Sequence, residues 1–138
     1  MQITRQTEYA VRTMVELASI PYGELLSTRM ISKHQKIPEV FLKKTIQLLA
    51  RAGLVQTRRG SHGGVRLIVP PDKITLADIL TAVEGEVALN VCLRERDICP
   101  NQPVCKVRHI LRRSQETLVR ELSRESLLDI VTGKVFDD

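Results

Sequence analysis

Residues 38–69, PEVFLKKTIQLLARAGLVQTRRGSHGGVRLIV, carry the pattern that decides the fold. The stretch opens with Pro38, which suits the first turn of a helix, and Gly53 supplies a helix stop. Two runs of strand-forming residues follow, at 54–58 and 65–69, on either side of a glycine-rich tip. This order predicts a helix followed at once by a β-hairpin.

Two shorter helical patterns precede this stretch. Apolar residues recur at helical spacing over residues 6–19, and Ser27 suits the N-cap of a second helix that reaches His34. In the third helix one face is expected to pack on a core, while the outer face carries Lys43 and Lys44. Two helices joined by a short turn, the second with a basic outer face, are typical of a helix-turn-helix. The residues expected to face the core are Phe41, Leu42, Thr45, Leu48, Leu49 and Ala52.

The tip of the predicted hairpin is basic and rich in glycine. Its residues are Arg58, Arg59, Gly60, Ser61 and His62. Glycine lets the backbone approach a duplex closely, and the arginines can reach phosphates or a minor groove. A phosphate-binding enzyme loop is the rival interpretation, but the sequence lacks the Walker pattern of strand, glycine-rich loop and helix. The sequence therefore predicts a mainly α fold with a small β-hairpin wing, and double-stranded DNA as its partner.

Charge is distributed unevenly along the 138 residues. Residues 1–71 hold 11 Lys and Arg against 4 Asp and Glu, a net charge of +7. Residues 72–138 hold 10 against 12, a net charge of −2. We therefore expect a winged helix-turn-helix DNA-binding domain over residues 1–71 and an assembly and sensing region over 72–138. The sequence shows neither a secretory signal nor an apolar run of membrane-spanning length, which favours a cytoplasmic protein without a membrane partner.

The second part of the chain contains three cysteines, Cys92, Cys99 and Cys105, and there are no others. An odd number of thiols cannot pair completely into internal disulfides, so the group favours a metal site. Three thiolates make an incomplete tetrahedral set and leave one position for a further ligand. Enzymatic activity is not expected, because the sequence contains neither a catalytic dyad nor a cofactor fingerprint.

Helical patterns flank the cysteines. Thr75 and Asp78 form a capping-box pattern for a helix that stops at Gly85, and residues 90–105 show no periodicity. A long charged helix then begins, with one narrow apolar stripe that requires a partner helix. It is predicted to be a dimerisation helix, with packing on the chain's own domain as the alternative. The stripe consists of Val107, Ile110 or Leu111, Ser114, Leu118 and Leu122.

Several kinds of thiol site remain open from the residues alone. A structural zinc site would combine the three cysteines with His109. A cluster-free thiol sensor would oxidise Cys99 or Cys105 reversibly. A small iron-sulfur electron-transfer protein is an alternative of another class, although the cysteine spacing is not that of ferredoxins.

Taken together, these segments resemble the Rrf2 family of iron-sulfur winged-helix transcriptional regulators. The resemblance rests on ITRQTEYAVR, FLKKTIQLLARAGLVQTRRGSHGGVRL, ITLADILTAVEGE and the cysteine trio. It implies a homodimeric repressor with a long helix exchanged between protomers. It also implies a 2Fe-2S or 4Fe-4S cluster, held by the trio, through which iron, redox state or nitric oxide sets operator affinity.

The resemblance further assigns the DNA contacts. The third helix would read base edges around Glu39, Lys43 and Lys44, with Thr28 at the start of the second helix beside it. Arg59 in the wing would reach the minor groove, and the other residues of the predicted hairpin tip would also contact DNA.

The fourth cluster ligand is where this chain departs from one branch of the family. That branch uses a histidine three residues after the last cysteine, and here that position is Arg108. His109 lies one residue further, about 100° around a helix. Another branch takes a carboxylate from the first helix of the partner chain, and the matching position here is Glu8. The resemblance therefore implies Glu8 of the partner chain as the first choice and His109 as the alternative.

Overall fold

The computed structural model describes residues 2–95, 99–102 and 104–135 of the chain. Its first part contains three helices, whose bounds lie within one residue of the predicted ones. The hydroxyl of Ser27 accepts the backbone N–H of Met30 at 3.4 Å, which confirms Ser27 as an N-cap. The helices are α1 (Arg5–Ala18), α2 (Thr28–Gln35) and α3 (Glu39–Arg51).

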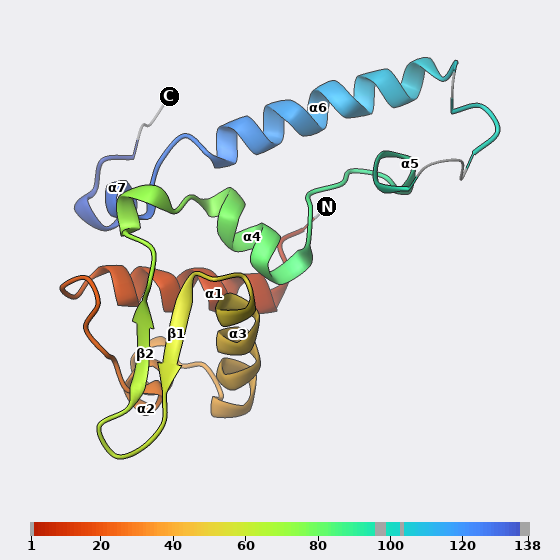
Figure 1. The fold of residues 1–138 in the computed structure, drawn as a ribbon. Helices are drawn as coiled ribbons and strands as arrows, with labels where there is room; N and C mark the ends of the chain where they lie inside the picture. Colours follow the sequence, from red (N-terminus) through yellow and green to blue (C-terminus); the bar gives the residue numbers. More distant parts are fainter. Residues whose placement is uncertain (1, 96–98, 103, 136–138) are drawn as a thin grey trace.

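The predicted hairpin is confirmed. Strands β1 (Val55–Arg58) and β2 (Gly64–Leu67) pair antiparallel, with Val55 opposite Leu67 and Arg58 opposite Gly64. Leu26, just before α2, forms a further antiparallel bridge to Val65 of β2. The hairpin is therefore fixed to the segment that leads into the helix-turn-helix, and its tip projects freely (Figure 1).

The core is aliphatic and spans both parts of the chain. It lies between α1, α3 and the hairpin, and it includes residues that follow the hairpin. Packing thus continues past residue 71, while the predicted assignment of DNA binding to 1–71 and sensing to 72–138 stays a prediction. The core residues are Ala10, Met14, Leu17, Ile31, Ile37, Leu42, Ile46, Leu49, Leu54, Val55, Val65, Leu67, Ile74, Ile79 and Leu127.

Three short elements close this core from above in Figure 1. They are the 3-10 turn η1 (Pro71–Lys73), α4 (Leu76–Glu84) and α7 (Leu127–Thr132). The capping box of Thr75 and Asp78 predicted for α4 is confirmed. Near the other end of the chain, the backbone N–H of Leu127 donates to the carbonyl of Ile74 at 2.7 Å. This bond joins the start of α7 to the start of α4.

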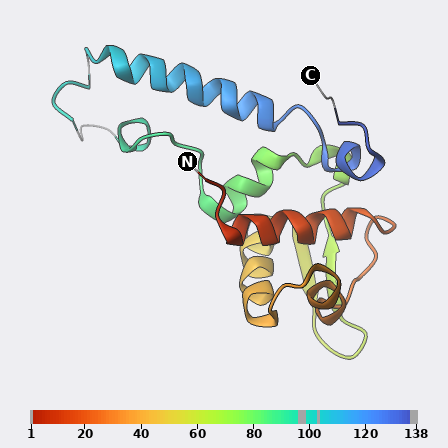
Figure 2. The same ribbon diagram turned by 180° about the vertical axis from the view of Figure 1, so that it is seen from behind.

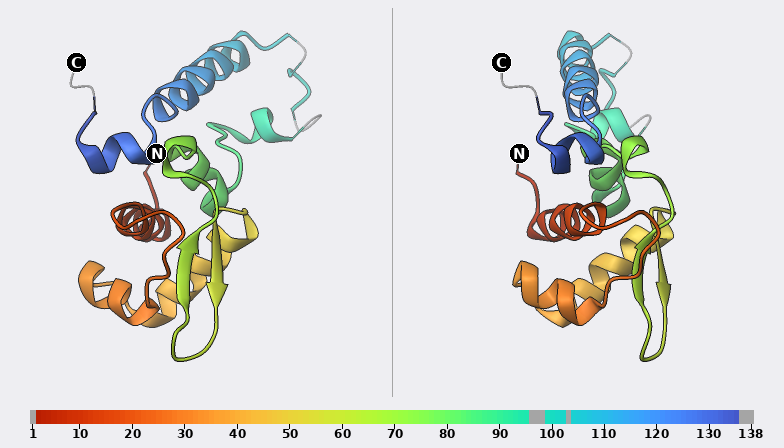
Figure 3. Two further views of the ribbon diagram at one scale, coloured as in Figure 1. Left: turned by 60° about the vertical axis from the view of Figure 1, so that its left-hand side comes forward. Right: turned by 90° about the vertical axis from the view of Figure 1, so that its left-hand side faces the viewer.

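The cysteine region and the long helix form an arm that projects from this body. The arm contains the one-turn helix α5 (Val91–Arg94) and α6 (Lys106–Leu122). Viewed from behind, the start of α6 extends well beyond α1 and α3 (Figure 2). The hairpin tip and the start of α3 lie at the opposite end of the molecule (Figure 3). Residues 90–105 were expected to lack helical periodicity. This expectation was wrong for the single turn of α5, whose N-cap is the side chain of Asn90.

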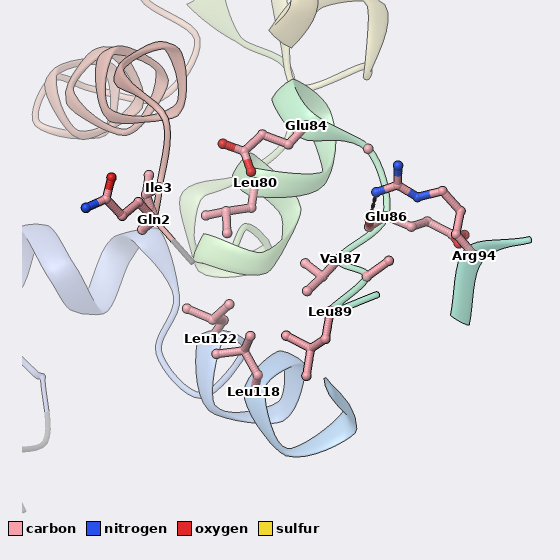
Figure 4. Close-up of a pocket in the computed structure, with 12 residues that line it drawn as sticks. Gln2, Ile3, Leu80, Glu84, Glu86, Val87, Leu89, Arg94, Leu118 and Leu122 are labelled. Carbon is pink, nitrogen blue, oxygen red and sulfur yellow. Dashed lines mark hydrogen bonds between the residues drawn. The ribbon is translucent and has the colours of Figure 1, made fainter. Parts of the chain in front are cut away.

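The end of α6 returns to the body across an apolar pocket. Leu118 and Leu122 face Leu80 of α4 and Val87 across a cavity of about 300 Å³ (Figure 4). At the start of α6, Val107 and Ile110 are instead exposed and Leu111 is half-buried, and no described residue of the helix is buried. Within one chain, packing therefore covers the predicted stripe only in part.

The face of α3 that packs on the core matches the predicted one in part. Ile46 is buried with Leu42, Thr45 and Leu49, whereas Phe41 is 53% exposed. The Phe41 ring instead lies against Tyr9 of α1, with centroids 6.3 Å apart. The expectation that Phe41 and Ala52 face the core was wrong, because the helix is rotated so that positions 42, 45, 46 and 49 form the inner face.

Among the described residues, no helix is both long and apolar enough to cross a bilayer.

Candidate functional site

The outer face of α3 is exposed and basic. Glu39, Lys43 and Lys44 all point away from the buried face, as the sequence predicted. Val40 and Gln47 lie on the same exposed face, because Val40 precedes Lys43 by three residues and Gln47 follows Lys44 by three. This face therefore presents two cations, a carboxylate and an apolar side chain to solvent.

The turn between α2 and α3 is fixed by bonds to its own residues and to α1. The hydroxyl of Ser32 donates to the carbonyl of Ile37 at 2.5 Å, across the left-handed Lys36. Glu16 of α1 receives the side chain of Gln35 through one oxygen and the ring of His34 through the other, each at 2.5 Å. These contacts hold α2 against α1, with half-buried Thr28 as its first residue.

The hairpin tip brings the predicted wing residues together. They are all exposed, and they are Arg58, Arg59, Gly60, Ser61 and His62. Gly60 has φ +105, which side chains rarely adopt, and its carbonyl accepts the N–H of Gly63 at 3.0 Å. A Cβ on Gly63 would collide with the carbonyl of Arg58. The glycines thus allow a tight tip that presents two arginines side by side in sequence.

The first turn of α1 is bonded to the elements on both sides. One oxygen of Glu84, at the end of α4, accepts the hydroxyls of Thr7 and Thr4 at 2.6 and 2.7 Å, and the Thr4 N–H at 3.1 Å. The bond from Thr7 contributes most to lowering the pKa of Glu84, those from Thr4 add to it, and burial opposes them. Gln6 donates to Thr45 of α3 at 3.2 Å. The turn therefore connects α3 with the helix that precedes the cysteine region.

The three cysteines line a common pocket at the outer end of the arm. All three are half-buried, and the cavity measures about 330 Å³. Cys92 lies in α5, and the sulfur of Cys105 accepts the backbone N–H of Arg108 at 3.4 Å as the N-cap of α6. The remaining lining consists of Asn90, Val91, Gln102, Val107, Arg108 and Leu111.

Two polar side chains cross-link this cysteine pocket. Gln102 donates through Nε2 to the carbonyls of Cys92 at 2.9 Å and Glu95 at 3.1 Å. Arg108 donates through Nε to the same Cys92 carbonyl at 3.2 Å. Sequence reasoning missed this role of both residues, since hydrogen bonds to backbone carbonyls seven to sixteen positions away leave no local pattern.

The donor set fits an iron-sulfur cluster in its chemistry, since thiolates are the usual protein ligands of such clusters. Within the described ranges, however, no three His, Cys, Asp or Glu side chains lie close enough together to hold a metal ion. The candidate fourth ligands lie outside the lining of the pocket. Glu8 is exposed on α1 and forms an ion pair with Arg12, and His109 is exposed on α6 beside the lining residue Arg108.

The comparisons with known proteins agree with the geometry of the winged helix. The Rrf2 family profile, described as an iron-dependent transcriptional regulator, matches residues 3–133. The chain belongs to the Rrf2 family. It is thus a member of a family of DNA-binding transcriptional regulators, which are not enzymes.

Two curated relatives and one solved structure illustrate the Rrf2 relationship. Protein aau3 of Rhizobium meliloti is 37% identical over 136 residues, covering 97% of this chain and 87% of the relative. The HTH-type transcriptional regulator NsrR of Bacillus subtilis is 30% identical over 135 residues, covering 97% and 92%. The structure of CymR, the global cysteine regulator of B. subtilis, superposes with a TM-score of 0.75 at 27% identity, covering 96% of this chain and 98% of that one.

Proposed function

We propose that this Rrf2 protein is a homodimeric repressor, located in the cytoplasm, whose operator affinity is set by an iron-sulfur cluster. Cys92, Cys99 and Cys105 hold the cluster, as 2Fe-2S or 4Fe-4S. When bound, it supplies an iron site that responds to iron supply, redox state or nitric oxide. The observation that carries the proposal is that all three thiols line one pocket at the start of the longest helix.

The chain's own residues prepare that pocket. Gln102 and Arg108 both bond to the carbonyl of Cys92, which keeps α5 beside the start of α6. Cys105 caps α6, so a change at its sulfur acts directly on the first turn of the dimerisation helix. The three thiols line a pocket in the arm and lie outside the aliphatic core.

We assign the fourth ligand to Glu8 of the partner subunit, with His109 as the alternative. Glu8 is exposed, and its carboxylate pairs with Arg12 on the same helix, so it is accessible to a second chain. As a ligand, Glu8 would join the first turn of α1 to the cysteine pocket of the other protomer. Because Gln6 bonds that turn to Thr45 of α3, loss of this ligand would alter the spacing of the two recognition helices. A coupling of about 1–3 kcal/mol, or 5–150-fold in affinity, is typical of such devices.

Purification without oxygen, followed by iron, sulfide and zinc analysis and an absorption spectrum, tests the cluster. We expect brown protein that turns colourless in Cys92→Ala, Cys99→Ala and Cys105→Ala. Glu8→Ala should shift the spectrum or speed the bleaching by oxygen, while His109→Ala, the matched control, should not. Colourless wild-type protein with stoichiometric zinc would contradict the cluster, and a spectrum that changes only in His109→Ala would reverse the ligand assignment.

A cluster-free thiol-redox regulator is the second candidate. It is favoured by the fact that, in the part of the chain that the structure describes, the thiols share a pocket without forming a ready metal site. Metal-free protein whose operator affinity changes on mild oxidation and returns with a reductant would support it. In that case Cys99→Ala or Cys105→Ala should abolish the response.

For DNA, we propose contacts from Thr28, Glu39, Lys43 and Lys44, and from the wing residues already named. Arg59→Ala should weaken operator binding about five- to tenfold and reduce the slope of log affinity against log salt by about 1, because the wing loses one cation that displaces counterions from the duplex. Arg120→Ala, which removes the same charge from the exposed face of α6, is the control. Fluorescence anisotropy over a salt series measures the operator affinity and the salt slope of each variant. An unchanged affinity and slope in Arg59→Ala would contradict the contact of Arg59 with DNA.

A further inference from the structure

Val40 is the most exposed large apolar side chain among the described residues, at 77%. It occupies the second position of α3, and sequence reasoning did not assign it a role. A valine in the first turn of a surface helix has lower helix propensity than Lys, Arg, Gln or Glu, and here it gains no burial. Its presence is therefore not explained by the stability of the chain.

Val40 belongs to the same face as the candidate DNA-contacting lysines. Lys43, Lys44 and Gln47 follow it at i+3, i+4 and i+7, which places all four side chains on one side of the helix. The buried face, formed by Leu42 and its neighbours at helical spacing, lies on the opposite side. Val40 is thus the apolar member of an otherwise polar and basic surface.

The neighbouring Phe41 shows what an internal role would look like. Phe41 is also exposed, but its ring lies against Tyr9, so it helps to join α1 and α3. Val40 is not among the side chains that pack against the core. Its own chain therefore leaves the side chain available to an external partner.

Charge and position identify that partner as the major groove of DNA. In a helix-turn-helix the N-terminal residues of the second helix contact base edges, and Val40 lies one residue from the start of α3. Lys43 and Lys44 beside it favour a polyanion. Thymine alone presents an apolar group in the major groove, its C5 methyl.

We infer that Val40 contacts the C5 methyl of a thymine in each operator half-site and so determines sequence preference at that base pair. The inference rests on the proposed DNA-binding role of α3. Lys43 and Lys44 hold the helix against the duplex, and Val40 distinguishes thymine from the three bases that lack the methyl. Burial of one methyl group predicts about a fourfold preference per half-site.

The test is a double-mutant cycle that combines removal of the methyl group from the DNA with truncation of the Val40 side chain in the protein. The operator is first selected from a random-sequence duplex pool with wild-type protein. Each thymine is then replaced by deoxyuridine, which lacks only the methyl, and binding of wild type and Val40→Ala is measured by anisotropy. We expect wild type to lose about fourfold at one symmetry-related thymine in each half-site, and Val40→Ala to show no loss there.

The controls separate this inference from the wider proposal. Ile68→Ala, an exposed apolar residue at the end of the hairpin away from its tip, should keep the wild-type response to deoxyuridine. The thermal midpoint of Val40→Ala should match wild type, because the side chain is exposed. If wild type selects no sequence, the DNA-binding proposal fails and this inference with it. Two outcomes would overturn only the inference once an operator has been selected. In the first, replacing thymine by deoxyuridine weakens binding of wild type and of Val40→Ala by the same factor at every position. In the second, the replacement weakens binding of wild type at no position.

Discussion

Helices α3 and α6 have similar sequence patterns but opposite degrees of burial. Both carry apolar residues at three-to-four spacing with charged residues between them. The 13-residue α3 buries Leu42, Thr45, Ile46 and Leu49, whereas no described residue of the 17-residue α6 is buried. The same kind of stripe is therefore satisfied within the chain in one case and left open in the other.

This difference separates a complete part of the molecule from an incomplete one. The winged helix, closed by α4 and α7, has its own aliphatic core. The start of α6 exposes Val107 and Ile110, at 61% and 52%, close to the cysteine pocket. An amphipathic helix with an unfilled face needs a partner, and the Rrf2 regulators are typically dimers. The thiols thus lie where a second chain is expected, and an effect on them can reach both protomers.

The largest effect should come from the closed core. Leu49→Ala removes a fully buried side chain, so it should lower the free energy of unfolding by about 2–5 kcal/mol. Urea denaturation measures the change. Because the contacts of Leu49 lie within one chain, the destabilisation should be the same at every protein concentration.

Leu111→Ala on α6 is the matched comparison for that experiment. Leu111 is half-buried at the cysteine pocket, and further burial is expected only in a dimer. Its destabilising effect should therefore grow as protein concentration rises through the dimer dissociation constant. If the destabilisation by Leu111→Ala were as independent of protein concentration as that by Leu49→Ala, α6 would not be completed by a second chain.

A charge on the open stripe should break the dimer without unfolding the chain. Ile110→Glu places a carboxylate where an apolar contact is expected, which should weaken dimerisation by at least about 2 kcal/mol, or 30-fold. Sedimentation equilibrium measures this, with far-ultraviolet circular dichroism as the check on folding. Arg112→Glu introduces the same group about 200° around the helix and should leave the dimer intact. A variant Ile110→Glu that stays dimeric would mean that this half of the stripe is not the interface.

The sequence predicted best those features that depend on neighbouring residues. Ser27 and the Thr75–Asp78 pair cap the helices that they were expected to cap, since a cap involves only three or four positions. The buried face of α3 was predicted only in part, because apolar residues at both Phe41 and Ile46 fit a helical stripe, and tertiary packing buries Ile46 while Phe41 lies against Tyr9 of α1.

In the candidate sites, too, the sequence predicted what depends on neighbouring residues and missed what depends on contacts between distant ones. The wing residues were predicted together because they are consecutive, and the three cysteines share a pocket as their proximity in sequence suggested. The bonds from Gln102 and Arg108 to Cys92 were not predictable, because loops of irregular backbone leave no periodic signal. The contact between Glu84 and Thr7 joins residues 77 positions apart, and it was missed for that reason.

That contact supports the smallest predicted effect, at the junction between the two parts. Its hydrogen bonds, chiefly from Thr7 and then from Thr4, lower the pKa of Glu84 below its ordinary value of 4.5. A lowered folded-state pKa means that the contribution to stability is fully present above the ordinary pKa and is lost as pH falls through the folded one. Because the carboxylate is largely exposed, the contribution should be at most about 1 kcal/mol.

Urea denaturation of wild type and Glu84→Gln between pH 7 and pH 3 measures this contribution. The difference between their free energies of unfolding should be largest at neutral pH and should shrink towards acid pH. Glu86→Gln, two positions further along, should follow the wild-type curve, since these bonds end on Glu84 alone. A constant difference across the range would show that the charge of Glu84 does not hold α1 to α4, and the link between the cysteine arm and the DNA-binding helices would then have to run elsewhere.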